Sequence, residues 1–295
     1  SMTKNNHTVA CVIDTETSWK NGNPRYVYHF GATFGDLEQS DSFEVFTMDY
    51  YPKEVIRELK YFLHQEKIEG KFKDKQGYTY NKSMERALQD AIDNPHKVKP
   101  WKDIMLEFNT MCKTMGVDYL ASYNFQFDIG TSSEKGGVIR HTHSQLTDDV
   151  WYMPRNVDIL CIMDIASSLY MNRDYQNYVD NLDDDLKEQV MTEGGNYSYS
   201  AECVQRYRTK DFSYVESHTA LRDSKLEFGL LSLFWGKWKN IIKKEYVNYI
   251  KPVHNSYIKR GLTAKDKRQI RLGNKEVLKK YPTQKELKLI GGKNG

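Results

Sequence analysis

The sequence predicts an α/β protein with a mixed central β-sheet flanked by helices. Short runs rich in β-branched and aromatic residues fill the first 50 residues, as expected of three neighbouring strands. Helical spacing of apolar residues begins near Pro52, and from about Asp118 strand-like runs alternate with helical segments. A β-rich start followed by this alternation is typical of an α/β domain whose sheet holds antiparallel and parallel strands.

Three strands are predicted at the start of the chain. The first is the continuous apolar run over residues 8–13, which is typical of a strand buried on both faces. A turn signal at residues 21–24 separates it from residues 26–34, and residues 43–48 form the third strand. Three consecutive strands predict an antiparallel meander.

Helices and two further strands follow. Apolar residues recur at three/four spacing between residues 52 and 115, interrupted by a polar loop at residues 69–80. Later segments are assigned by the same rules: strands at 118–123 and 156–163, and helices beginning at 164–171, at 200–208 and at 217–238. The acid-rich stretch 174–193 is predicted to be a solvated insertion.

The charge of the chain is unevenly distributed. All 295 residues together carry 43 Lys and Arg against 40 Asp and Glu, yet residues 236–295 alone carry a net charge of +13 and the rest −10. A basic extension favours a polyanionic partner such as nucleic acid, although basic tails also serve solubility alone. We therefore expect a catalytic domain over residues 1–235, with insertions at about 50–99 and 172–196, and a mostly helical extension over 236–295.

Composition excludes several classes of protein. An aromatic content of 13% is too high for a disordered chain, and no apolar run approaches the roughly 18–20 residues of a membrane span. The first residues contain no signal-peptide core. The four cysteines are scattered, which favours reduced thiols. We expect a cytoplasmic protein without a membrane partner.

Two carboxylates, Asp14 and Glu16, end the first predicted strand. Side chains two residues apart in a strand point to the same face, so this pair would repel and lose hydration unless a cation neutralises it. Carboxylate oxygens are ligands that Mg²⁺ and Mn²⁺ prefer. Taken alone, an Asp-x-Glu sequence after a strand more often begins a polar turn.

Two further carboxylates and a histidine follow. Asp128 comes just after the strand at 118–123, where by itself it is better explained as a helix N-cap. Asp223 lies three residues before Leu226, on the predicted core-facing stripe of the long helix, where a charge requires a partner. His218 would be about 140° from Asp223 around a regular helix, so we expect it before the helix, leaning over the site.

Together these residues form three ordered motifs: Asp14-x-Glu16, Asn124-x-x-Phe127-Asp128 and His218-x-Ala220-x-x-Asp223. With them the sequence resembles the DEDD superfamily of 3′→5′ exonucleases, in the DEDDh subgroup that includes DnaQ-like proofreading exonucleases and ribonuclease T. The resemblance covers residues from about 8 to 234. The long insertions and the Tyr-, Asn- and Lys-rich composition are similar to those of exonucleases encoded by large bacteriophages.

The resemblance implies a ribonuclease H-like exonuclease fold and a metal-dependent 3′→5′ exonuclease. Such an enzyme hydrolyses single-stranded DNA or RNA from a free 3′ end, releases 5′-mononucleotides and uses two divalent cations, Mg²⁺ or Mn²⁺. The resemblance assigns metal binding to Asp14, Glu16, Asp128 and Asp223. His218 is the expected general base, since an imidazole titrates near neutral pH.

The resemblance also suggests residues that meet the substrate. The expected set is Thr15, Thr17, Asn124 and Phe127. The aromatic residues Trp19, Tyr123 and Phe125 lie near the motifs and are candidates for base stacking, the alternative being that they belong to the core. His141 and His143 have no nearby cysteine or second histidine pair, which favours a surface segment over a zinc site.

Other functions stay open. A nucleic-acid-binding or host-interaction protein on the same fold, in which nuclease activity is ancillary, is the main alternative. The presence of all four carboxylates argues against a non-catalytic binding module. An endonuclease on a ribonuclease H-like fold is another, opposed by the His218-to-Asp223 spacing. A polymerase or a host protein is a candidate partner, in the host cytoplasm if the chain is phage-encoded. The sequence does not decide between DNA and RNA.

Overall fold

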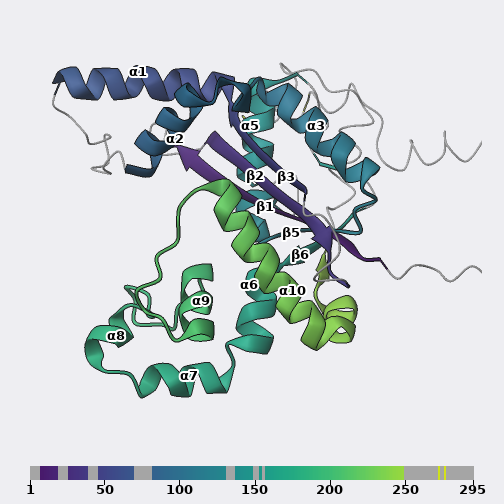
Figure 1. Cartoon of the computed structure of the whole chain (residues 1–295), viewed down its shortest axis with the longest axis vertical. Helices are drawn as coiled ribbons and strands as arrows, with labels where there is room; N and C mark the ends of the chain where they lie inside the picture. The colour runs from purple at the N-terminus through teal and green to yellow at the C-terminus, as the bar shows by residue number, and fades with distance from the viewer. Residues whose placement is uncertain are drawn as a thin grey trace, which may run out of the picture.

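A mixed β-sheet forms the centre of the protein. The computed structural model describes residues 7–18, 26–38, 46–69, 82–130, 137–148, 153–154 and 157–248, together with Leu272 and Glu276. Within these residues the sheet has seven strands in the order β4-β3-β2-β1-β5-β6-β7 (Figure 1). Their bounds are β1 Val9–Ser18, β2 Tyr26–Asp36, β3 Phe46–Pro52, β4 Val98–Lys99, β5 Tyr119–Ser122, β6 Asp158–Cys161 and β7 Val247–Asn248.

The strand directions match the predicted fold class. Strands β1, β2 and β3 pair in antiparallel fashion, which confirms the expected meander. Strand β5 lies parallel to β1, and β6 lies parallel to β5. The predicted α/β fold with a mixed sheet flanked by helices is therefore confirmed, and β1 lies at its centre.

Ten α-helices are described around this sheet. Their bounds are α1 Lys53–Glu69, α2 Lys82–Asp93, α3 Trp101–Thr114, α4 Phe125–Asp128, α5 Val138–Leu146, α6 Ile162–Ile165, α7 Arg173–Asp180, α8 Asp184–Glu188, α9 Ala201–Thr209 and α10 Ala220–Glu245. A 3₁₀ turn at Pro95–Lys97 precedes β4, and a π-helical turn at Ala166–Tyr170 continues α6. Figure 1 shows α10 lying across the strands, with α6 to α9 grouped beyond it.

The side chains of β1 alternate between two covered faces. Cys11 and Ile13 belong to the core that includes Trp101 and other residues of α3, whereas Ala10 and Val12 belong to the core formed with α10. Both faces of the strand are buried, as its continuous apolar sequence predicted. The same alternation directs Asp14 and Glu16 toward the α10 side of the sheet.

Helix α10 begins close against the sheet at Gly31. This residue pairs with Asp14 across β1 and β2. A Cβ atom built at Gly31 would lie 2.4 Å from the carbonyl carbon of Ala220, the first residue of α10. Only glycine therefore lets the helix begin directly over this part of the sheet.

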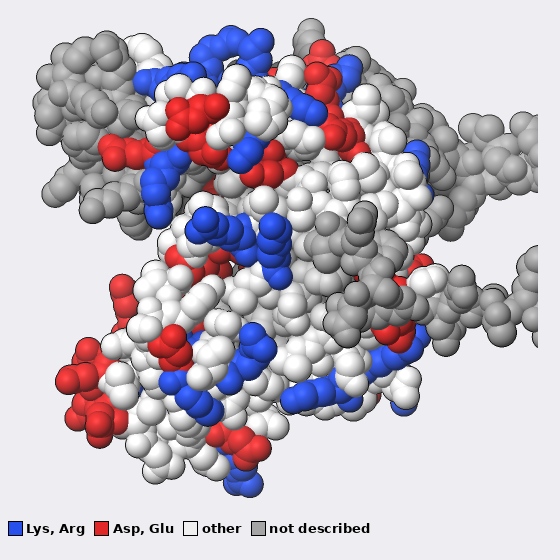
Figure 2. All heavy atoms as spheres, in the orientation of Figure 1, with Lys and Arg blue, Asp and Glu red and all other residues white. Residues whose placement is uncertain are grey.

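The acid-rich stretch 174–193 is more than a solvated insertion, and that prediction is wrong for its apolar residues. Tyr175, Val179 and Val190 are fully buried in the core that also contains α9 and α10 residues. Tyr175 and Val179 lie four residues apart and so share one face of α7. The acidic side chains of this stretch are exposed, and Figure 2 shows acidic side chains gathered over α8.

Helix α10 continues past the end of the predicted catalytic domain at residue 235. The helix kinks at Trp238, Ile242 is fully buried, and β7 then pairs with β6. The division at residue 235 remains a prediction, and apart from Leu272 and Glu276 the residues after Asn248 lie outside the described part of the chain. No helix in the described ranges combines the length and apolar character that a membrane span requires.

Candidate metal centre

Strand β1 supplies the first two carboxylates of the site. Asp14 and Glu16 lie on the face toward α10, each with part of its residue surface still exposed. One atom is nevertheless sealed off, because Asp14 Oδ2 is buried without a hydrogen-bond partner in the described structure. The pairing of β1 with β2 becomes irregular between Glu16 and Thr17, as is common beside functional sites.

Asp128 is the last residue of the short helix α4, so the N-cap interpretation does not apply. It is 5% exposed, and its Oδ1 accepts a hydrogen bond of 2.6 Å from the hydroxyl of Thr15. Gly137 fixes the backbone behind it, since a Cβ there would lie 2.5 Å from the Asp128 carbonyl carbon. Thr15 and Gly137 together hold this carboxylate against β1.

Asp223 and His218 come from the start of α10. Asp223 is 3% exposed in the first turn of the helix, and its Oδ1 accepts a hydrogen bond of 2.8 Å from Ser217 Oγ. His218 lies before the helix, as predicted, in the left-handed backbone region with φ of 51°. Such a conformation is uncommon for a non-glycine residue and is often retained at functional sites.

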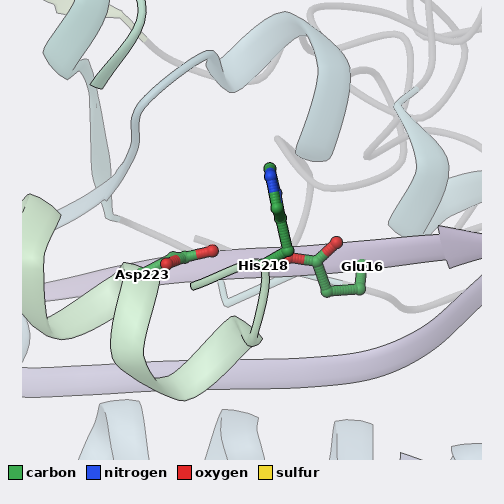
Figure 3. A group of neighbouring side chains, drawn as sticks. All are labelled: Glu16, His218 and Asp223. Carbon is green, nitrogen blue, oxygen red and sulfur yellow. The ribbon is translucent and has the colours of Figure 1, made fainter. Parts of the chain in front are cut away.

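Three of these side chains meet directly. Ligand atoms of Glu16, His218 and Asp223 all lie within 4.8 Å of one another. Figure 3 shows them arriving from β1, from the segment before α10 and from the first turn of α10. The predicted histidine-to-carboxylate arrangement is thus formed by segments about 200 residues apart in the sequence.

The carboxylates share one electrostatic environment. Burial, followed by the charges of Glu227, Asp128, Glu16 and Asp223, raises the pKa of Asp14 well above its ordinary value. Burial and the neighbouring negative charges raise the pKa of Glu16 to about 8. Burial raises the pKa of Asp128 to about 7, although the Thr15 hydrogen bond opposes the shift. These shifts have one physical cause: the acids lie close together and away from water, where their charged forms are disfavoured.

Two acidic residues at the site were missed by the sequence analysis. Glu227 lies one turn after Asp223, is 2% exposed, and has an unpartnered buried Oε2. Burial and the charges of Asp223 and Glu202 raise the pKa of Glu216 to about 7. Glu227 had a sequence signal, because it follows Asp223 by four residues on the same helix face.

A histidine on β2 fixes the beginning of α10. His29 is buried, and its Nδ1 accepts a hydrogen bond of 3.2 Å from the backbone N–H of Ala220. Its Nε2 is then the protonated nitrogen and donates to Asp49 Oδ1 at 2.5 Å. Asp49 also pairs with Lys97 Nζ at 2.9 Å. This chain of contacts anchors the helix that carries Asp223.

The predicted substrate-binding residues occupy different environments. Thr15 is buried and its hydroxyl is engaged by Asp128, whereas Thr17 is half-buried beside it on β1. Asn124 precedes α4 and accepts backbone hydrogen bonds from Phe127 and Asp128 through its carbonyl oxygen. Asn124 and Phe127 are both half-buried. Their contact with a substrate stays a prediction.

The stacking candidates are largely core residues. Tyr123 and Phe125 are buried, and the Tyr123 hydroxyl donates to the carbonyl of Tyr199. Trp19 lies outside the described residues. The predicted surface location is wrong for His143 in α5, which is 3% exposed and accepts a hydrogen bond of 3.2 Å from Trp101 Nε1. His141 in the same helix is half-buried.

The donor set fits divalent cations. Carboxylate oxygens are hard ligands suited to Mg²⁺ or Mn²⁺, and Asp14 Oδ2 and Glu227 Oε2 are buried acceptors with no donor. Unpaired buried carboxylates are costly unless a cation neutralises them. Asp14, Glu16, Asp128 and Asp223 are therefore residues that could hold such ions.

Comparisons with known proteins give likenesses in structure alone. No family model matches the chain, and no curated protein matches its sequence. One similar structure is described as "3'-end specific recognition of histone mRNA stem-loop by 3'-exonuclease". Its TM-score is 0.46 at 10% sequence identity, and the match covers 78% of this chain and 82% of the other chain. The nuclease domain of 3'hExo, described as a DEDDh family member bound to rAMP, has a TM-score of 0.45 and 11% identity, covering 84% and 99%. Cell-death related nuclease 4 has a TM-score of 0.40 and 10% identity, covering 77% and 64%. Likenesses of this size carry no conclusion about the activity of this chain.

Proposed function

We propose that this protein is a metal-dependent 3′→5′ exonuclease that removes 5′-mononucleotides from single-stranded nucleic acid. One observation carries the proposal: ligand atoms of Glu16, His218 and Asp223, which come from separate sequence motifs, lie within 4.8 Å of one another. Beside them Asp14 Oδ2 is buried without a partner, and burial together with the charges of neighbouring acids raises the pKa of Asp14. Burying several carboxylates together costs free energy, and such a set is expected where divalent cations bind a phosphodiester.

Each motif residue has a role in this proposal. Asp14, Glu16 and Asp223 would hold one Mg²⁺ or Mn²⁺, and Asp14 with Asp128 a second. Bound cations would neutralise charge on the phosphate and on the leaving oxygen. The ring of His218, which is exposed next to Glu16 and Asp223, would accept the proton of the attacking water.

Neighbouring groups would orient the substrate. Thr17, Asn124 and Phe127 remain the proposed contacts to the terminal nucleotide, and Thr15 would contribute by holding Asp128. Arg222 and Lys225 are exposed on the first turns of α10, and Figure 2 shows basic side chains over this part of the helix. They and the basic extension would attract the phosphate backbone, an effect that added salt weakens.

Several expectations from the sequence belong to the proposal at the same level. They are membership of the DEDDh subgroup, an origin in a bacteriophage, a cytoplasmic location and a polymerase or host protein as partner. DNA and RNA are both candidate substrates, and the experiment below distinguishes them.

The test is hydrolysis by the full chain with Mg²⁺ or Mn²⁺ and with a chelator. Single strands of DNA and RNA labelled at the 5′ end should shorten stepwise, and strands labelled at the 3′ end should release labelled mononucleotide. Circular single strands, which lack a 3′ end, should resist. The double variant Asp14→Asn, Glu16→Gln should lose the activity, because it keeps the shape of both side chains but removes their charge.

A matched control is Asp183→Asn, which changes an exposed carboxylate beside α8 and should leave the rate unaltered. Equal activity of the double variant and the parent would refute the assignment of the carboxylates. Cleavage of circular strands as fast as linear ones would refute exonuclease action in favour of an endonuclease. Binding of nucleic acid without hydrolysis in any metal would support a binding module instead.

A further inference from the structure

Glu227 is a buried acid on the core-facing stripe of α10. The buried residues of this helix follow three/four spacing and are Ala220, Asp223, Ser224, Glu227, Leu230, Leu231, Phe234, Trp235 and Ile242. Glu227 thus occupies a position between Asp223 and two leucines that an apolar residue would ordinarily fill. It is only 2% exposed, and its Oε2 accepts no hydrogen bond in the described structure.

The charged groups that act on Glu227 are other acids of the site. Burial raises the pKa of Glu227 well above its ordinary value, and the charges of Asp128, Glu216, Asp223 and Glu16 raise it further. In return, the charge of Glu227 is the largest influence on the pKa of Asp14 after burial itself.

Tyrosines complete these surroundings. Tyr123 directly follows β5. Burial raises the pKa of its hydroxyl, and the charge of Glu227 raises it further. Burial also raises the pKa of Tyr214, in the segment after α9, and nearby acids raise it further: Glu216, Asp223, Glu202 and Glu227. Within the described residues no Lys, Arg or His forms an ion pair with Glu227 or with Asp14.

A purely structural role does not explain this residue. A buried carboxylate stabilises a fold when donors or cations satisfy it, and replacing an unsatisfied one by an apolar residue of similar volume is commonly neutral or stabilising. Oxygen atoms of Asp14 and Glu227 are both buried and both lack a donor. A divalent cation would satisfy both acids at once. Within the described residues no side chain donates a hydrogen bond to either of these two atoms.

We propose that Glu227 is a fifth carboxylate of the metal centre, contributing to the binding of a divalent cation together with Asp14 from the interior side of the site. This inference rests on the proposed function only in requiring that the centre binds Mg²⁺ or Mn²⁺. It adds a residue outside the three motifs, and it assigns to α10 two cation-binding acids, Asp223 and Glu227, one helical turn apart.

The experiment is a calorimetric titration of Mn²⁺ into the metal-free full chain without any nucleic acid. We expect Glu227→Gln to weaken Mn²⁺ binding by about 10- to 100-fold, the usual effect of losing a group that supports metal ligands. Glu227→Met should weaken it equally while raising the melting temperature of the metal-free chain, because a buried carboxyl group that lacks a hydrogen-bond partner is replaced by an apolar side chain. General damage to the fold would not raise the melting temperature while weakening the binding of Mn²⁺.

Glu245→Gln is the matched control, because Glu245 is exposed at the other end of the same helix; it should bind Mn²⁺ as the parent does. If Glu227→Gln and Glu227→Met both bind Mn²⁺ as tightly as the parent, the inference is wrong while the proposed function stands. If the parent itself binds no Mn²⁺ and Asp14→Asn changes nothing, both the inference and the proposed function fail.

Discussion

The environment of His218 is that of a proton acceptor and differs from that of the structural histidines of the chain. It is exposed, it lies in the left-handed region, and it stands beside two carboxylates that would otherwise repel each other. By contrast, His29 and His143 are buried and accept hydrogen bonds from the protein itself. Exposure and unusual backbone geometry together favour a role in chemistry for His218.

We predict that His218→Asn lowers kcat by about 10²- to 10⁴-fold, the usual contribution of a general base. Asparagine tolerates the left-handed region, so the loop before α10 should keep its shape. Affinity for Mn²⁺, measured by calorimetry, should change little, because the carboxylates remain. A loss of Mn²⁺ affinity as large as the loss of kcat would instead make His218 a metal ligand.

At the scale of elements, the site depends on how the first turn of α10 sits on β2. Two contacts fix it: Gly31 leaves room for the helix backbone, and His29 accepts a hydrogen bond from its first N–H group. Asp223 is carried on this turn, whereas Asp14 is carried on β1 opposite Gly31. The separation of the two acids is therefore set by packing of backbone against backbone.

We predict that Gly31→Ala destabilises the chain by about 1–3 kcal/mol, as overpacking of a filled core does. The shift of α10 should also reduce turnover, on the order of 10²-fold for a displacement of about 1 Å. Gly229→Ala and Gly236→Ala are matched controls on α10, because a Cβ there meets nothing within 4 Å. They should be neutral or slightly stabilising in thermal unfolding, and equal behaviour of Gly31→Ala would refute this packing argument.

The sequence predicted the elements that local periodicity determines. The meander, the paired acids of β1 and the burial of Asp223 follow from alternation along a strand and from three/four spacing along a helix. The predicted core-facing stripe of the long helix includes Leu226 and so leaves out Glu227. Leu226 is only half-buried, since packing on β1 and β2 turns a neighbouring face of α10 inward. Tertiary packing likewise buries Tyr175, Val179 and His143 inside segments that look polar.

At the scale of the whole molecule, two sets of acidic residues in the described part of the chain have opposite environments. Asp36, Glu38, Asp49, Asp90 and Glu107 each have a hydrogen-bonding or cationic partner, and these partners hold their pKa values below the ordinary ones although partial burial opposes the shift. The acids around Asp14 have raised pKa values, because burial dominates and their neighbours are also acidic. The near-neutral total of +3 hides this separation.

This division predicts how stability depends on pH. Glu16 has a pKa of about 8 in the folded chain against an ordinary 4.5, and Asp128 has about 7 against 3.8. Between these limits the folded chain binds more protons than the unfolded chain, so the free energy of unfolding falls as pH rises, by about 1.4 kcal/mol per pH unit for each extra proton. Below about pH 4 the trend reverses, because the carboxylates with lowered pKa values then lose their partners' stabilisation.

We therefore expect the metal-free chain to melt at a higher temperature near about pH 5.5 than near about pH 8.5. Saturating Mn²⁺ binds the deprotonated acids and should raise the melting temperature most at the higher pH, flattening or inverting the slope. The double variant Asp14→Asn, Glu16→Gln should show a shallower slope in chelator and little response to Mn²⁺, because it lacks two of the titrating acids. Melting curves recorded at both pH values, with chelator and with Mn²⁺, test this directly. A metal-free parent that is more stable at the higher pH would show that these carboxylates are already satisfied within the protein and do not await a cation.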